Sequence, residues 1–137
     1  MVTLVDTNVL IDVAYATSPW RRWSAQRLIE ARDAGPVIVN PIVVAEFAAG
    51  FESEAQLNQA LSPRRFSKED LPWEAAFLAG RAFAAYRRSG GEKTSPLPDF
   101  YIGAHAQVRG YRLISRDVKR YRTYFPDLDL IAPDTHP

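Results

Sequence analysis

The chain contains no cysteine, and only two of its 137 residues are histidines. Without cysteine there can be no disulfide bond, no thiolate metal site and no cysteine nucleophile. No apolar run reaches the ~18 residues that a membrane-spanning helix needs. The N-terminus also lacks the basic first region of a signal peptide. We therefore expect a cytoplasmic protein with no membrane partner.

Several familiar catalytic motifs are also missing. Neither GxxxxGK[ST] nor GxGxxG occurs, so no glycine-rich phosphate loop is expected. There is no GxSxG motif, and Ser115 has no obvious histidine partner. His105 follows Asp99 by six positions, which places it on a different face of a helix, and His136 lies in the C-terminal tail. Neither histidine is expected to bind a metal.

The residues that are present suit one folded domain spanning residues 1–137. Hydrophobic residues make up 47% of the chain, enough for a substantial core. Among the 17 basic residues only Lys68, Lys93 and Lys119 are lysines, so the remaining 14 are arginines. Arginine binds phosphate in a bidentate manner and stacks on nucleic-acid bases. Arginine-biased codon usage explains the same excess, and both interpretations stay open.

Apolar runs alternate with helical patterns along the chain. Residues 2–5, 37–39, 112–115 and 128–131 are predicted strands, whereas residues 62–71 have no clear pattern. Helices are predicted over residues 8–15, 19–34 (with Ser18 as the N-cap) and 54–61, and from Pro41, Pro72, Pro98 and Asp117 onward. This alternation predicts an α/β domain with a mainly parallel sheet and right-handed crossovers. Ligands bind such sheets beyond the C-terminal strand ends.

Two of four noteworthy acidic residues lie where that crevice should form. Asp6 and Asp117 follow predicted strands, Asp99 lies in the first turn of a helix, and Glu46 lies within an apolar helix. Each alone has an ordinary explanation as a helix cap, a dipole partner or a solvated side chain. Together they would repel one another and raise their pKa values, and a divalent cation would offset that cost.

Oxygen ligands without cysteine or a histidine pair favour Mg²⁺ or Mn²⁺ over Zn²⁺. Magnesium keeps several water ligands, so such a site has open positions for a phosphate oxygen and a water nucleophile. The four carboxylates therefore indicate metal-assisted phosphodiester hydrolysis.

Four segments together resemble the PIN-domain ribonucleases, and most closely the VapC-type toxins of type II toxin–antitoxin pairs. They are VDTNVLID with Asp6, the AE step with Glu46, LPDFYIGAHA with Asp99, and LISRDVKRYRTYFPDLDLIAP with Ser115 and Asp117. The resemblance implies a three-layer fold with a sheet of about five strands. It also implies an endoribonuclease that uses Mg²⁺ or Mn²⁺ to cut single-stranded or loop RNA.

Carried over by position, the resemblance assigns catalysis and metal binding to Asp6, Glu46, Asp99 and Asp117. Asn8 and Ser115 resemble the polar residues that orient these carboxylates or a bound water. Many family members carry Thr and Asn where this chain has Ser115 and Asp117, so the role of Asp117 is the least determined. One or two metal ions would activate the water, and the product would carry a 5′-phosphate.

Substrate and partner residues are also expected. Arg116 and Lys93 are candidates for holding the RNA backbone, with surface solvation as the alternative. The resemblance implies a homodimer and a VapB-type antitoxin whose tail covers the site. Apolar helices could supply a groove for a partner helix, although we expect most of their large aromatic residues to pack in the core. These residues are Trp20, Trp23, Trp73 and Phe77.

Two competing interpretations remain. A non-catalytic PIN-like domain would bind RNA or a partner without cutting, although the intact set of four carboxylates argues against it. A phosphatase or phosphoacceptor domain would use Asp6 as a nucleophile. Such domains usually carry a second acidic residue close behind the first, whereas Thr7 and Asn8 follow here.

Overall fold

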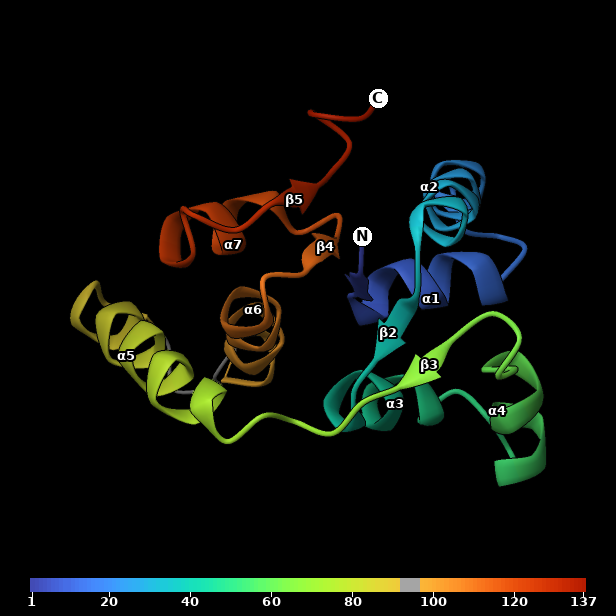
Figure 1. Cartoon of the computed structure of the whole chain (residues 1–137), viewed down its shortest axis with the longest axis horizontal. Helices are drawn as coiled ribbons and strands as arrows, with labels where there is room; N and C mark the ends of the chain where they lie inside the picture. Colours follow the sequence, from blue (N-terminus) through green and yellow to red (C-terminus); the bar gives the residue numbers. More distant parts are fainter. Residues whose placement is uncertain (92–96) are drawn as a thin grey trace.

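Five parallel strands form one sheet in the order β3-β2-β1-β4-β5 (Figure 1). The computed structural model describes residues 1–91 and 97–137, so the predicted RNA contact of Lys93 lies outside the described residues. The strands are β1 (Thr3–Val5), β2 (Val37–Val39), β3 (Ser67–Lys68), β4 (Arg112–Ile114) and β5 (Leu130–Ile131). The α/β class and the parallel five-stranded sheet are confirmed.

The central strands are short and mostly apolar, because both faces of a parallel sheet are covered by helices; Thr3 of β1 and Arg112 of β4 are the polar exceptions. Strand β3 was missed in the sequence, where residues 62–71 showed no pattern. Ser67 and Lys68 are both polar and exposed, and they form an edge strand beside β2. Pairing with a neighbouring strand made this segment a strand, and such pairing leaves no trace in local hydrophobicity.

Seven helices occur among the described residues, close to their predicted positions. They are α1 (Thr7–Ala14), α2 (Arg21–Ala34), α3 (Pro41–Ala48), α4 (Glu54–Ala60), α5 (Glu74–Arg88), α6 (Leu97–Arg109) and α7 (Val118–Tyr124). Helix α2 begins at Arg21, two residues after Pro19, which was predicted as its first residue. The Ser18 hydroxyl donates to Asp12 Oδ1 at 2.8 Å and accepts from the Trp20 amide at 3.2 Å, which holds this segment as a turn.

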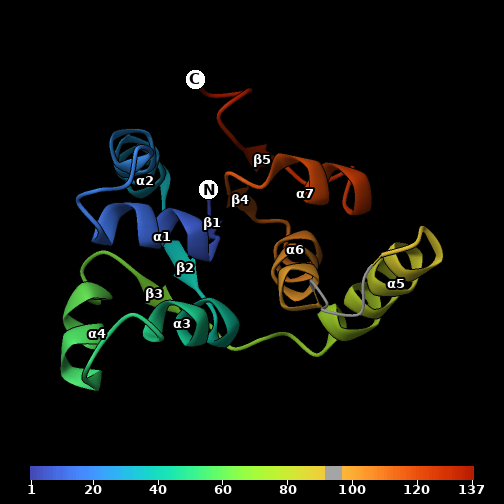
Figure 2. The ribbon, with the colours of Figure 1, turned by 180° about the vertical axis from the view of Figure 1, so that it is seen from behind.

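Helices cover both faces of the sheet. Helices α1 and α2 lie on one side of the line of strands, and α5, α6 and α7 lie on the other (Figures 1 and 2). Helix α3 packs against both α1 and α6, so it connects the two layers. Within residues 1–91 and 97–137, no helix has the length and apolarity to cross a membrane.

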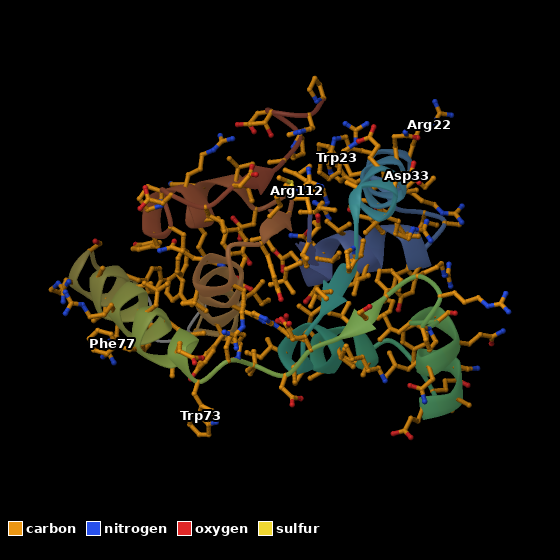
Figure 3. All side chains as sticks on the ribbon, viewed as in Figure 1. Arg22, Trp23, Asp33, Trp73, Phe77 and Arg112 are labelled. Carbon is orange, nitrogen blue, oxygen red and sulfur yellow. The ribbon has the colours of Figure 1, made fainter. Side chains whose placement is uncertain are left out.

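Helix α5 buries alanines and not the large aromatic residues that were expected in the core. Its inward residues are Ala75, Ala79 and Ala82, whereas Trp73 is 90% exposed and Phe77 75% exposed. Figure 3 shows these two aromatic side chains projecting away from the ribbon. Small alanine side chains let α5 lie close against α6, and the helix rotates its bulky residues outward. The expectation of core packing for Trp73 and Phe77 was therefore wrong.

The other two tryptophans lie near the turn before α2. Trp20 is partly exposed and stacks on the Arg116 guanidinium, whose centre is 5.4 Å from the ring centroid. Trp23 packs against the core, and its indole donates to the His136 carbonyl at 2.6 Å. Core packing is thus confirmed for Trp23 and not for Trp20.

Helix α6 approaches α7 closely at Gly103. A methyl group on Gly103 would lie 2.7 Å from the Phe125 ring, well inside van der Waals contact. The absence of a side chain therefore sets the distance between α6, which carries Asp99, and the segment that carries Asp117.

Candidate active site

Asp6 occupies the centre of the candidate site, directly after β1. Its carboxylate is 4% exposed and also caps α1, because Oδ1 accepts from the Thr7 amide at 2.8 Å. The other oxygen, Oδ2, accepts from Ser115 Oγ at 2.7 Å, Tyr121 OH at 3.0 Å and Asn8 Nδ2 at 3.3 Å. Four donors from three segments thus hold one carboxylate in a fixed orientation.

Burial raises the pKa of Asp6 from 3.8 to about 6. The hydrogen bond from Ser115 opposes this rise, while the negative charge of Asp99 adds to it. Removing water destabilises the charged form, and a second carboxylate nearby has the same effect. The Asp6 pKa therefore records both a desolvated position and a neighbouring charge.

Glu46 lies at the rim of the site. Its helix begins at the Asn40 cap, and the Thr7 hydroxyl donates to Glu46 Oε1 at 2.7 Å. The residue is exposed, so its flank of α3 faces the crevice edge and not the core. The charge of Glu46 still raises the pKa of Asp99, which places the two carboxylates in electrostatic contact across α3 and α6.

Asp99 and Asp117 face each other across Arg120. Arg120 Nη1 donates to Asp99 Oδ2 and lies 3.4 Å from Asp117 Oδ2. Burial raises the pKa of Asp99, Arg120 opposes that rise, and the charges of Glu46 and Asp117 add to it. Asp117 is at the N-cap position of α7 but makes no capping bond with its side chain. Its side chain contacts Arg120 of the same helix instead of capping the helix backbone.

Asn8 and Ser115 link the strands to the carboxylates. The Ser115 hydroxyl donates to Asp6 and accepts from the Asp117 amide at 2.9 Å. Asn8 Nδ2 also reaches Ser115 Oγ at 3.3 Å, and Asn8 Oδ1 accepts from the Arg116 amide at the same distance. These contacts fit the supporting role predicted for both residues.

The Arg116 side chain turns away from the carboxylates toward α1. Its Nε and Nη2 atoms donate to Asp12 at 2.6 and 2.9 Å. Asp12 is buried, accepts from Ser18 and Ser24 as well, and has a lowered pKa despite its burial. The guanidinium can therefore offer RNA only its remaining N–H groups, unless the pair with Asp12 opens.

Three residues of the site were not identified in the sequence: Thr7, Arg120 and Tyr121. Tyr121 is fully buried, and burial together with the Asp6 charge raises its pKa well above 10, so its hydroxyl stays a donor. Arg120 and Tyr121 follow Asp117 by three and four positions, which is one helical turn. This spacing could have identified Arg120 and Tyr121 from the sequence, because residues one helical turn after a site residue lie on the same face of the helix.

The donor set suits a hard divalent cation in its chemistry. Four carboxylates supply oxygen atoms; burial is the main cause of the raised pKa values of Asp6 and Asp99, and repulsion between the carboxylates adds to it. Among the described residues, however, no three His, Cys, Asp or Glu side chains already stand close enough to hold an ion. Arg120 lies between two of the candidate ligands, Asp99 and Asp117.

His105 belongs to a separate buried network. Asn40 Oδ1 caps α3 by accepting from the Val43 amide, so its Nδ2 faces His105 Nδ1 at 3.1 Å. His105 Nδ1 must then accept, and Nε2 donates to Glu69 Oε2 at 2.6 Å. Burial lowers the pKa of His105, in agreement with a neutral ring. Its role is therefore structural, joining α6, α3 and the end of β3.

Comparisons with known proteins agree with this architecture. Residues 3–126 match the family model described as PIN domain. No curated protein matches the sequence. A VapBC2 structure from Rickettsia felis, bound to a promoter DNA fragment, shares 18% identity and a TM-score of 0.75, covering 96% of this chain and 98% of that one.

Two further structures cover nearly the whole chain. VapBC-1 from nontypeable Haemophilus influenzae shares 20% identity and a TM-score of 0.71, over 96% of this chain and 98% of that one. A toxin–antitoxin complex from Klebsiella pneumoniae shares 26% identity and a TM-score of 0.63, over 94% and 95%. The chain therefore belongs to the PIN domain family, with the fold found in VapBC toxin–antitoxin complexes.

Proposed function

We propose that this protein is a metal-dependent endoribonuclease, the VapC-type toxin of a toxin–antitoxin pair. Membership in the PIN domain family supports a nuclease, and the similar structures are toxin–antitoxin complexes. The observation that carries the proposal is that Asp99 is electrostatically coupled to Asp6, Glu46 and Asp117, which come from three other segments. Like charges gather in this way where a cation is to be bound.

Each residue has a distinct part in the proposed reaction. Asp6 is the fixed ligand, since Ser115, Tyr121 and Asn8 prevent its carboxylate from turning. Asp99 and Asp117 are the adjustable ligands, both in contact with the partly exposed Arg120. Glu46 at the exposed rim is placed to accept a proton from an attacking water. A bound Mg²⁺ or Mn²⁺ would polarise the phosphate and lower the pKa of that water.

The first test removes one charge from the site. Asp99→Asn keeps the size of the side chain but removes the negative charge. We expect it to lower Mg²⁺- or Mn²⁺-dependent cleavage of single-stranded RNA by at least about 100-fold, a loss of the size seen when one stabilising group is removed. EDTA should abolish cleavage by the wild-type protein, and cleavage sites mapped on total RNA would identify the substrate.

The matched control is Asp33→Asn. Asp33 is an exposed carboxylate on α2, and Figure 3 shows it on the outer side of that helix. This variant should cleave RNA at the wild-type rate. Full metal-dependent cleavage by Asp99→Asn would refute the carboxylate mechanism.

An apolar groove on the surface could accept a helix of the antitoxin. The groove has a volume of about 260 Å³ and lies between α1, α2 and α4. Apolar side chains line it, including Val13, Ile29 and Phe66, and the exposed Arg32 and Arg65 also line it. An amphipathic helix with acidic flanks has the complementary surface. We propose that the VapB-type antitoxin docks here, with its tail continuing to the carboxylates.

The outer face of α5 is apolar and exposed. This face consists of Trp73, Phe77, Gly80 and Ala84, all exposed. An exposed apolar stripe of this kind usually marks an interaction surface. A twofold dimer needs only one such self-complementary patch. We therefore propose a homodimer through the α5 outer face.

Two alternatives remain testable. A domain that binds RNA without cutting it agrees with the ion pair between Arg120 and Asp99, which leaves the ligands unassembled. Absence of both metal binding and cleavage would favour it. An Asp6 nucleophile is disfavoured, because Asp6 is buried and both its oxygens accept hydrogen bonds. Covalent phosphorylation of Asp6 by a small phosphodonor would revive that mechanism.

A further inference from the structure

Arg120 lies between two carboxylates that are candidate metal ligands. A single atom, Nη1, contacts Asp99 Oδ2 from α6 and lies 3.4 Å from Asp117 Oδ2, which precedes α7. Two carboxylates from different segments are thus held together by one positive charge. The same oxygen atoms are the ones a divalent ion would need, so the arginine and the ion compete for them.

The surroundings of Arg120 allow it to leave. Its side chain is 31% exposed, and its contacts among the described residues are to Asp99 and Asp117. Arg116, only four residues earlier, is held more firmly than Arg120. It makes two hydrogen bonds to the buried Asp12 and stacks on Trp20. Of these two arginines beside the site, one is fixed by a buried partner and the other is exchangeable.

Displacement would also leave the Arg120 side chain beside the site, where it could contact a phosphate. Once a cation takes over Asp99 and Asp117, the guanidinium has lost its partners but stays tethered to α7 beside them. A phosphate entering the site carries the negative charge that replaces those partners, and the arginine fork matches phosphate oxygens. The same side chain then acts first as a substitute for the ion and later as a contact to the substrate.

We propose that Arg120 holds Asp99 and Asp117 together in the metal-free protein, is displaced when a divalent ion binds, and then binds the RNA phosphate at the site. The inference rests on the proposed metal-dependent function. It identifies a substrate-binding residue.

The test of displacement is a titration with Mn²⁺, with free ion followed by electron paramagnetic resonance. Arg120→Gln removes the competing charge and should bind Mn²⁺ about fivefold more tightly than the wild-type protein, a change typical of a partly exposed ion pair. Arg120→Lys should lie between the two. The control is Arg122→Gln on the same helix, since Arg122 pairs with the exposed Asp134 and should leave affinity unchanged.

The test of the RNA contact uses fluorescence anisotropy of a labelled single-stranded RNA, with Ca²⁺ in place of Mg²⁺ and the RNA checked for integrity. With the ion present, Arg120→Gln should weaken binding about three- to tenfold and reduce the salt slope by about one. With EDTA the variant should bind RNA as the wild-type protein does, because Arg120 is then engaged with its carboxylates.

The outcomes separate this inference from the function on which it rests. Equal or weaker Mn²⁺ binding by a folded Arg120→Gln overturns displacement, while metal-dependent cleavage by the wild-type protein would leave the nuclease function intact. Unchanged RNA binding in Ca²⁺ overturns the phosphate contact. If neither protein binds Mn²⁺, the metal-dependent function itself fails, and the inference fails with it. Thermal unfolding of each variant checks that it is folded.

Discussion

Asp6 illustrates how one residue can be both a structural and a chemical element. It caps α1, accepts bonds from three side chains and has a pKa of about 6. A pKa of about 6 in place of 3.8 corresponds to roughly 3 kcal/mol of free energy that opposes the ionised form. The metal-free protein therefore holds this carboxylate at a cost in stability, as expected where charge is kept for function.

The first prediction concerns Asp6→Asn in EDTA. The folded state binds the Asp6 proton more tightly than the unfolded state, so wild-type stability falls as pH rises from about 4 through 6. Asp6→Asn has no carboxylate to ionise at this position, so its stability does not fall for this reason as pH rises. The difference in unfolding free energy, variant minus wild type, should therefore grow by up to about 3 kcal/mol between pH 4 and pH 7.5.

Urea unfolding at several pH values measures that difference. A constant offset is expected at every pH, because asparagine cannot accept all the hydrogen bonds that Asp6 receives; only the trend with pH is diagnostic. Asp33→Asn should show no trend. A flat difference for Asp6→Asn would mean that the carboxylate is not desolvated.

At the scale of elements, the residue that caps the N-terminus of α3 is hydrogen-bonded to the buried His105. Asn40 caps α3 and also faces His105, which in turn bonds Glu69 beyond β3. Tyr111 donates to the other Glu69 oxygen at 2.7 Å. One capping residue therefore fixes α3, which carries Glu46, against α6, which carries Asp99.

The second prediction compares two helix caps. Asn40→Ala should lower the unfolding free energy by about 2–4 kcal/mol, because it removes the cap and leaves a buried ring nitrogen without a partner. Ser53→Ala removes the exposed cap of α4 and should cost about 0.5–1 kcal/mol. Urea unfolding at pH 7.5 measures both. Equal losses would show that the His105 network contributes nothing beyond the cap.

At the scale of the whole molecule, two apolar surfaces lie on different elements. The α5 outer face carries Trp73 and Phe77, whereas the apolar groove between α1, α2 and α4 carries Ile29. Figure 1 shows α5 far from α2 and α4, so a partner on one surface need not obstruct the other. A dimer that binds antitoxin on each protomer is compatible with this arrangement.

The third prediction separates these two surfaces. Trp73→Glu should convert the dimer into a monomer in light scattering while still binding the antitoxin encoded by the neighbouring upstream gene. Ile29→Glu should lose the antitoxin in co-purification but remain dimeric, because a buried charge at either surface is strongly unfavourable. Strictly monomeric wild-type protein at high concentration, or a loss of both interactions in one variant, would contradict the assignment.

Much of the fold could be predicted from local patterns. Short apolar runs predicted four of the five strands, and proline or a capping residue located most of the helix starts. The exceptions have a common cause. The polar β3 and the rotated α5 are set by partners distant in sequence, namely an adjacent strand and a closely packed helix, so local periodicity carries no information about them.

The sequence by itself determined the α/β class, the absence of thiol and histidine metal chemistry, and the four carboxylates near strand and helix ends. Those properties follow from residue type and short-range spacing. Only the tertiary structure decided that Asp6 is desolvated, that Glu46 lies at an exposed rim and that Arg120 bridges Asp99 and Asp117. Burial, charge and ion pairing depend on distances between segments far apart in the chain, and only folding sets those distances.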